Sequence, residues 1–360
     1  MSRNAFFSVG RCLLVVLISI GVAPAATAQA RDAGPARAPR RAVAKKPLYS
    51  VQRSLSRNTA QRSLSRKARL ARARAAATAR EVADTIVPRY KVDASGDLVP
   101  DIRAAAAIIY NPETNQVLWE ENSQSQRSIA SITKVMTAVA FLEDNPDLTQ
   151  EVTVVRGDVF RASTTYLRAN DRITADELLH LLLIASDNAA ARVLARVSPY
   201  GADAFVQRMN GKAAELGLES TQYADPSGLL SDNVSSAYDM ARLIAHASAN
   251  EKISSIMRLP EYTVQTSKRS ISVHSTNHML GRQDFDVRAA KTGFISKSGY
   301  CFATLLRLPQ SGHQVALVVL GARSNAGRFV ETQNLFNWIS NKAATIFATS
   351  APAVTAAPQD

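Results

Sequence analysis

Phe285-Asp286-Val287-Arg288-Ala289-Ala290-Lys291-Thr292-Gly293 is the most informative stretch of this chain. The run Phe285–Ala290 is typical of a strand, and it leads into the tripeptide Lys291-Thr292-Gly293, which occurs once in 360 residues. Lys291 offers a fixed positive charge and Thr292 a hydroxyl, while Gly293, expected on an inner strand, lets a ligand backbone approach closely. Apolar strands follow, so we interpret the tripeptide as a binding strand rather than as a surface strand end before a turn.

A second string, Ser131-Ile132-Thr133-Lys134, opens a segment whose apolar residues recur at helical spacing. A serine at a helix start meets the positive end of the helix dipole and free backbone N–H groups. Lys134 follows about one turn later on the same face, so its amine can reach the Ser131 hydroxyl. Taken alone, the string fits a serine cap beside a solvated lysine better, and its weight comes from its order with the other strings.

The third string, Ser186-Asp187-Asn188, lies between the apolar run Leu178–Ala185 and a second helical segment, Ala189–Val197. A junction between two buried helices can hold polar side chains inward, although an ordinary helix cap is the alternative. The same tripeptide recurs as Ser231-Asp232-Asn233, in a loop after Asp225-Pro226-Ser227-Gly228. We favour Ser186 because a rigid helix junction positions a proton relay better than a loop does.

Together the three strings supply a nucleophile, a base, a proton relay and an anion clamp without a histidine. A serine hydroxyl is a poor nucleophile until a base removes its proton, and a lysine with a pKa of about 10.4 is protonated at neutral pH. Burial and a second cation, Lys291, would both lower the pKa of Lys134. The pattern therefore predicts acyl transfer through a serine ester, with Lys134 as the base of Ser131.

The order of predicted elements indicates one antiparallel sheet with helices inserted into it. Predicted strands are Ala104–Tyr110, Gln116–Glu120, Tyr262–Gln265, Val287–Lys291, Tyr300–Arg307 and Gln314–Gly321. Predicted helices are a mostly helical stretch from Ser131 to Leu218, with strand-like pieces in Val152–Ala169, and then Ser235–Ala249 and Gly327–Phe347. This order predicts an α+β fold in one domain, 93–347, with the site where the first helix, the helical insertion and a sheet edge meet.

These strings resemble the serine D-Ala-D-Ala peptidases, the low-molecular-mass penicillin-binding proteins. The likeness extends to Asp225-Pro226-Ser227-Gly228-Leu229 and to Ser235–Ala241. Thr276-Asn277-His278, Lys291–Phe294 and Gly299-Tyr300-Cys301 look most like the D-alanyl-D-alanine endopeptidase branch. The resemblance covers roughly residues 93 to 346, and it implies the β-lactamase/transpeptidase-like fold, an antiparallel sheet flanked by helices with a mostly helical subdomain.

The resemblance also implies a role for each residue of the site. Three would be catalytic: Ser131 as the acylated nucleophile, Lys134 as its general base and Ser186 as the relay that protonates the leaving amine. The substrate-binding residues would be Asn188 for the substrate amide, Lys291 and Thr292 for the carboxylate end, Gly293 for close approach, and Phe294, whose backbone N–H would form the oxyanion hole with that of Ser131.

One position departs from the family pattern. The family usually has a hydroxyl residue two places after the glycine, where this chain has Ile295 followed by Ser296. The departure weakens the expected recognition of a free terminal carboxylate, and it favours cleavage within a cross-link over trimming of a terminus.

The resemblance predicts a peptidoglycan D,D-peptidase that acts through a serine acyl-enzyme, with stem peptides and cross-links as substrates and β-lactams as covalent inhibitors. The favoured activity is that of a D-alanyl-D-alanine endopeptidase in cell-wall remodelling, with a carboxypeptidase as the alternative and a non-enzymatic wall-binding protein as the alternative of another class.

A β-lactamase shares the three strings, but no Glu-x-x-x-Asn stands between Ser186 and Lys291 to activate water. No cofactor and no metal are expected, because the five histidines show no ligand spacing. His278 is the most plausible site-lining histidine, on resemblance.

The chain begins with a pattern typical of a cleaved export signal, residues 1–28. Arg3 and Arg11 precede the apolar run Cys12–Val22, which is too short to span a bilayer, and the small residues Ala26-Thr27-Ala28 follow. Export to the periplasm would remove Cys12 and leave Cys301, which we interpret as a buried strand residue.

A basic, low-complexity segment follows, residues 29–92, which we expect to be disordered with a transient helix over Lys67–Thr85. Residues 31–90 hold 16 Lys and Arg against 3 Asp and Glu, a net +13 that equals the charge of the whole chain. The export signal argues against a nucleic-acid partner, so we expect contact with anionic lipid or an acidic cell-wall polymer; a solvated spacer is an equal alternative. A flexible tail, 348–360, is predicted at the other end.

Overall fold

The computed structural model describes residues 67–77, 79 and 89–348. The predicted export signal, most of the basic segment and the predicted tail beyond residue 348 therefore lie outside the described residues. Residues 67–77 are helical with exposed side chains, which agrees with the first part of the helix predicted over Lys67–Thr85. No helix within the described ranges is long and apolar enough to cross a membrane.

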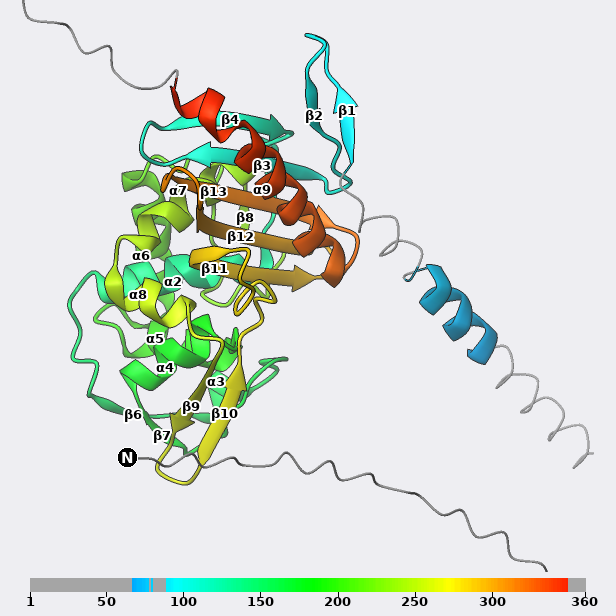
Figure 1. Ribbon diagram of the computed structural model, residues 1–360. Helices are drawn as coiled ribbons and strands as arrows, with labels where there is room; N and C mark the ends of the chain where they lie inside the picture. The colour runs from blue at the N-terminus through cyan, green and yellow to red at the C-terminus, as the bar shows by residue number, and fades with distance from the viewer. Residues whose placement is uncertain (1–66, 78, 80–88, 349–360) are drawn as a thin grey trace, which may run out of the picture. The chain divides into compact units, whose positions relative to one another are not determined.

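The centre of the fold is a five-stranded antiparallel sheet (Figure 1). Its strand order is β11 (Asp286–Ile295), β12 (Gly299–Arg307), β13 (Gln314–Ala322), β3 (Ala106–Asn111) and β4 (Gln116–Glu121). The sequence of β13 explains its central place, since nearly every position is apolar and the side chains alternate between two faces. Val315, Leu317 and Val319 enter one core, and Ala316, Val318 and Leu320 enter the other. A strand with this pattern needs a layer on each side of the sheet.

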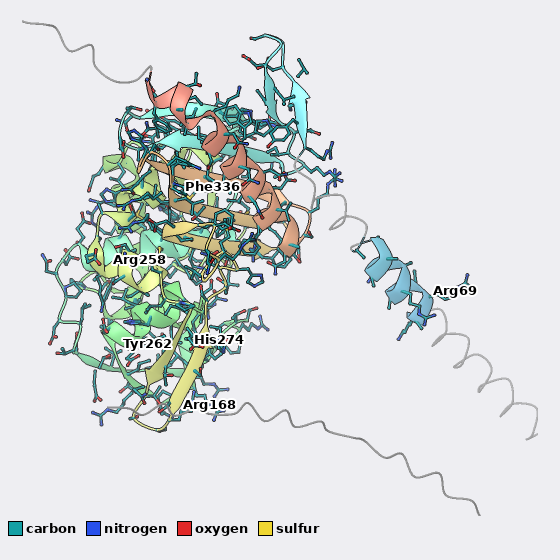
Figure 2. The ribbon with its side chains drawn as sticks, in the orientation of Figure 1. Arg69, Arg168, Arg258, Tyr262, His274 and Phe336 are labelled. Carbon is teal, nitrogen blue, oxygen red and sulfur yellow. The ribbon has the colours of Figure 1, made fainter. Side chains whose placement is uncertain are left out.

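One face of the sheet is covered by α9 (Asn325–Ala348), which lies across β12 and β13 (Figure 1). Its Leu335 and Ile339 are fully buried, and the ring of Phe336, labelled in Figure 2, packs edge-on at 5.0 Å from that of Phe285. The indole Nε1 of Trp338 donates a 2.9 Å hydrogen bond to the Leu98 carbonyl, and so ties the hairpin of β1 (Tyr90–Val92) and β2 (Leu98–Pro100) to this helix.

The other face carries α7 (Ala237–Ser248) and, beyond it, a mostly helical subdomain. Its helices are α2 (Thr133–Leu142), α3 (Arg156–Val159), α4 (Ala175–Leu183), α5 (Asn188–Val197), α6 (Gly201–Glu215) and α8 (Glu251–Met257). Two-stranded pairs complete it: β5 (Arg127–Ser128) with β8 (Val234–Ser235), β6 (Glu151–Thr153) with β7 (Arg172–Thr174), and β9 (Glu261–Gln265) with β10 (Ser270–His274). The predicted α+β architecture is confirmed, although the strand content expected within Val152–Ala169 is limited to the end of β6.

The position of Gly293 corrects one expectation. We predicted an inner strand, but β11 is the edge strand of the sheet and pairs only with β12, where Gly293 lies opposite Cys301. The tripeptide is buried although it lies at an edge, because the 3-10 turn η1 (Ala130–Ile132) packs against it. The strand also continues through the tripeptide to Ile295, rather than ending at Lys291 as predicted.

Candidate active site

A cavity of about 450 Å³ opens beside this edge of the sheet. Its walls come from η1, the segment between α3 and β7, the α4–α5 junction, the loop before β8, the segment before β11, β11 itself and α9. Six of the eight predicted site residues line it: Ser131, Ser186, Asn188, Thr292, Gly293 and Phe294. The other two, Lys134 and Lys291, are buried and reach Ser131 and Ser186 with their amines. The structure therefore brings all eight together.

Ser131 lies in η1, one turn before α2 begins at Thr133. The residue before it, Ala130, has a φ of +48°, a left-handed conformation that residues with a side chain rarely adopt. Two glycines enclose this turn: a Cβ on Gly228 would lie 2.0 Å from the Ala130 carbonyl oxygen, and one on Gly293 would lie 2.6 Å from the Ile129 carbonyl oxygen. The atoms closest to Gly293 thus belong to the backbone of the chain itself, whereas we expected this glycine to make room for a ligand.

Lys134 on α2 is fully buried, and three oxygen atoms surround its amine. Its Nζ lies 2.9 Å from the Ser131 Oγ, 2.7 Å from the Asn188 Oδ1 and 2.5 Å from the Ser227 carbonyl oxygen. The last two atoms can only accept hydrogen bonds, and a neutral amine has two N–H bonds to donate. Its lone pair is then directed at the Ser131 hydroxyl, which is the arrangement that a general base requires.

Burial lowers the pKa of Lys134 to about 7, although Asp225 and Asp187 act in the opposite direction. A large part of the lysine is therefore neutral near neutral pH. The cation that lowers this pKa further is Arg192, where we had expected Lys291. Lys134 does lower the pKa of Lys291.

The loop that contacts Lys134 is held by a single carboxylate, Asp225. Its Oδ1 accepts hydrogen bonds from the backbone N–H groups of Ser227 (2.6 Å) and Gly228 (2.8 Å), and its Oδ2 accepts from Asn233 Nδ2 (2.8 Å). Burial alone would raise its pKa, but these donors outweigh burial and keep the pKa below its usual value. Asn233 of the repeated tripeptide is thus a loop support, and its Ser231 lines a different cavity.

Ser186 lies at the α4–α5 junction with a φ of +58°. This left-handed backbone aims its hydroxyl at β11, where Lys291 Nζ donates to it at 2.8 Å and also to the Thr292 carbonyl oxygen at 3.0 Å. The structure therefore places Ser186, and not Ser231, beside the second lysine.

Lys291, for which we expected a fixed positive charge, has a lowered pKa. The residue is 1% exposed, and burial, Lys134 and Arg328 together hold its pKa well below the usual value. A carboxylate in the cavity would oppose each of these effects, because a nearby negative charge favours the protonated amine. A bound carboxylate would therefore favour the charged form of Lys291.

Asn188 and Asp187 form a rigid support behind the cavity. Asn188 Nδ2 donates to the Ala162 carbonyl oxygen at 2.7 Å, which leaves its Oδ1 facing Lys134. Asp187 is fully buried and caps α5, since its Oδ1 accepts from Ala190 N at 2.9 Å while its Oδ2 accepts from Tyr166 N at 2.6 Å. Within Ser186-Asp187-Asn188, the residue that caps the helix is therefore Asp187.

Further residues complete the cavity around β11. The hydroxyls of Thr276 and Thr292 lie 2.6 Å apart, and the half-exposed ring of Phe294 stacks on Tyr300 at 4.2 Å. Arg328, from α9, is a buried cation of the wall, and its Nη1 donates to the Gly293 carbonyl oxygen at 3.1 Å. Burial lowers its pKa to about 10, so it stays charged at neutral pH.

Sequence reasoning missed Arg328, Ser163 and Thr164 as residues of this cavity. Arg328 stands 37 residues after Lys291 in the first turns of a helix, and no local pattern marks it. His278, proposed as a site-lining histidine, is absent from the wall; its ring stacks on Phe329 at 4.9 Å. Among residues 67–77, 79 and 89–348, no cluster of three or more His, Cys, Asp or Glu could hold a metal ion.

Comparison with known proteins identifies the family. The family model of peptidase S11, described as D-alanyl-D-alanine carboxypeptidase, matches residues 93–324. The D-alanyl-D-alanine endopeptidase of Pseudomonas aeruginosa is 30% identical over 260 residues, covering 71% of this chain and 83% of that protein. That of Haemophilus influenzae is 33% identical over 227 residues, covering 62% and 78%.

Solved structures give the same answer for the fold. The Streptomyces K15 DD-transpeptidase superposes with a TM-score of 0.62 at 25% identity, covering 66% of this chain and 97% of that one. Penicillin-binding protein D2 of Listeria monocytogenes, in its cefotaxime-bound form, superposes with a TM-score of 0.59 at 29% identity, covering 68% and 99%. With Ser131 and Lys134 in contact beside a cavity at the sheet edge, this chain belongs to the S11 family of serine D-Ala-D-Ala peptidases.

Proposed function

We propose that this chain is a D-alanyl-D-alanine endopeptidase that cleaves peptidoglycan cross-links through an acyl-enzyme on Ser131. The observation that carries the chemistry is the 2.9 Å contact between Ser131 Oγ and Lys134 Nζ, whose other two neighbours can only accept. Such an amine, with a pKa of about 7, can take the serine proton at neutral pH.

In the acylation step, the Ser131 proton moves to Lys134 as Oγ bonds to the carbonyl carbon of the scissile amide. The backbone N–H groups of Ser131 and Phe294 would stabilise the oxyanion, a contribution of roughly 3–4 kcal/mol per donor. The C–N bond then breaks as Lys134 passes this proton by way of the Ser186 hydroxyl to the leaving amine, which leaves Lys134 neutral again. In the second step, water gives a proton to Lys134 as it attacks the ester carbonyl, and Lys134 returns that proton to the Ser131 Oγ as the ester C–O bond breaks.

Two features support the endopeptidase over the carboxypeptidase. Relatives with the endopeptidase name match at 30 to 33% identity, while the named carboxypeptidases match at 28 to 30%. In the cavity itself, Ile295 contributes an apolar side chain where the family usually offers a hydroxyl to a terminal carboxylate. A substrate whose chain continues past the scissile bond loses less binding free energy when Ile295 replaces this hydroxyl residue.

The test of the proposed function is product analysis. Purified protein is incubated with cross-linked muropeptide dimers and, separately, with free pentapeptides, and the products are identified by mass. We expect monomers from the dimer to form faster than tetrapeptide from the pentapeptide. The reverse preference would make the chain a carboxypeptidase, and no cleavage of either would favour a wall-binding protein.

Variants test the proposed roles. Ser131→Ala is expected to abolish the covalent penicilloyl adduct while the protein stays folded. Ser186→Ala is expected to slow acylation, and the identical change at Ser231 in the second tripeptide is its matched control, with no effect on acylation. An adduct on Ser131→Ala, or equal effects at the two serines, would contradict the assignment.

We further propose that residues 1–28 direct export to the periplasm and that residues 31–90 contact anionic lipid or an acidic cell-wall polymer. The support is the net +13 of this segment, which a negatively charged surface would attract. Pull-down with anionic vesicles or cell wall is expected to weaken with salt and with deletion of residues 31–90. Binding that ignores both changes would dismiss the electrostatic contact.

A further inference from the structure

A second cavity, of about 320 Å³, opens near the first one, outside the site described above. It is lined by Gln126, Arg127, Ser128, Ser231, Asp232, Val234, Lys297 and Ser298. No residue is shared with the cavity of Ser131.

The two cavities nevertheless share their walls, because three segments run from one into the other. Strand β5 contributes Arg127 and Ser128 to the second cavity and leads within three residues to Ser131. The loop before β8 lines the first cavity at Leu229 and the second from Ser231. The end of β11 and the turn after it do the same, since residues 293–296 line the first cavity and residues 297–298 line the second. Three residues span at most about 11 Å, so the second cavity lies within reach of an extended ligand bound at Ser131.

Two polar atoms of residues in the wall of the second cavity lack partners. The Arg127 Nε and the Ser128 Oγ are both buried behind this wall without a hydrogen-bond partner. Within residues 89–348, no carboxylate pairs with the side chain of Arg127 or of the exposed Lys297. Two cations without a carboxylate partner in the wall of one cavity indicate a place for a ligand that carries negative charge.

We propose that this cavity is a carboxylate subsite of the enzyme, which holds a free carboxylate of a stem peptide while the scissile bond lies at Ser131. The planar guanidinium of Arg127 suits a carboxylate, with Lys297 as a second charge. Asp232 offsets one of the two positive charges and leaves the cavity net positive. A single terminal residue extends only about 3.5 Å, so the ligand must continue for about three residues, as a stem peptide does.

This inference rests on the proposed D,D-peptidase function, but binding can be measured without turnover. In the non-acylating Ser131→Ala protein, calorimetry gives the Kd of a cross-linked muropeptide dimer with free carboxylates and of the same dimer with carboxamides in their place. We expect the free acid to bind about tenfold more tightly. Arg127→Gln or Lys297→Gln is expected to remove most of this preference, and Arg127→Lys to retain part of it.

The matched control is Lys268→Gln, an exposed lysine in the β9–β10 turn that lines neither cavity, and its preference should equal that of the parent protein. If Arg127→Gln proves unstable in a thermal melt, Lys297→Gln on the exposed turn decides the matter alone. A free pentapeptide, compared with its carboxamide in the parent and the Arg127→Gln proteins, identifies the source: a preference that Arg127→Gln removes assigns the carboxylate to the acylated stem, and one that Arg127→Gln leaves unchanged assigns it to the second stem.

An unchanged preference in both variants would overturn the subsite. Failure of the proposed function has a different signature, since the wild-type protein would then leave the dimer uncleaved whatever the Kd values of the variants.

Discussion

Gly228 and Gly293 both pack against the turn that carries Ser131, and neither has room for a methyl group. A Cβ on Gly228 would lie 2.0 Å from the Ala130 carbonyl oxygen, and one on Gly293 would lie 3.2 Å from Ser131 N. Ser131 is thus fixed by backbone contacts from two segments far apart in the sequence. We infer that these glycines serve the geometry of the enzyme itself before any ligand binds.

The first prediction concerns Gly228→Ala. Its φ of +79° costs about 1–2 kcal/mol for a residue with a side chain, and the clash with Ala130 adds roughly 1–3 kcal/mol more. We expect a loss of about 2–5 kcal/mol in the free energy of unfolding and at least a hundredfold slower acylation by a penicillin. Denaturant titration and stopped-flow acylation measure the two effects.

Gly281→Ala is the matched control, because Gly281 has the same φ of +79° and no atom within 4 Å of the added Cβ. It should lose only the backbone contribution of about 1–2 kcal/mol and keep its acylation rate. Equal losses in the two variants would show that the enclosure of Ser131 contributes nothing.

The second prediction concerns pH. Lys134 acts as a base only when neutral, and burial lowers its pKa to about 7. The neutral fraction rises as pH rises through this pKa, so the acylation rate should increase about tenfold per pH unit below 7 and level off above 8. Second-order rate constants with a penicillin, measured from pH 5 to 9, give the profile. A profile that keeps rising towards pH 10 would mean that Lys134 has an ordinary pKa.

The residues of the candidate site could be identified from the sequence where they belong to local strings. Ser131 and Lys134 share one helical turn, and Asn188 opens a helix, so their relation follows from helical spacing. Fold class was predictable for a similar reason, since β12 and β13 are nearly continuous apolar runs that only a sheet covered on both faces can bury.

What escaped prediction depends on contacts between distant segments. Strand β11 lies at the edge of the sheet, but η1 packs against it and Lys291 is buried. The apolar neighbours of Lys291 suit an inner strand equally well, so the sequence did not reveal the edge position. Two supporting contacts were missed for the same reason: that of Asp225 with the loop beside Lys134, and that of Arg328 with the Gly293 carbonyl oxygen. Asp225 lies 91 residues after Lys134 and Arg328 lies 37 residues after Lys291, and no local periodicity of the sequence indicates such a contact.

The third prediction follows from the conditional charge of Lys291. Its pKa is held well below the usual value by burial, Lys134 and Arg328, and a bound carboxylate should raise it. Binding of a D-Ala-D-Ala peptide to the Ser131→Ala protein at pH 8 is therefore expected to take up as much as about one proton. Calorimetry in two buffers with different ionisation enthalpies measures this uptake.

The control ligand is the same peptide with a C-terminal carboxamide, which brings no negative charge and should bind without proton uptake. The control variant is Lys291→Met, which removes the titrating amine and should abolish the uptake seen with the acid. Identical uptake with acid and carboxamide would mean that the proton goes elsewhere.

The last prediction separates the two tasks of Asp187. This buried carboxylate caps α5 through Ala190 N and holds Tyr166 N, so Asp187→Ala should lower the free energy of unfolding by about 1–2 kcal/mol. Asn188 is the next residue and orients Lys134, so a shift of the helix start should also slow acylation by about 10–100-fold. Asn250→Ala is the matched control, because Asn250 caps α8 through Ile253 N and lies outside the catalytic cavity. Both variants should lose stability, but only Asp187→Ala should lose acylation; if the two variants acylate at the same rate, Asp187 is a cap and nothing more.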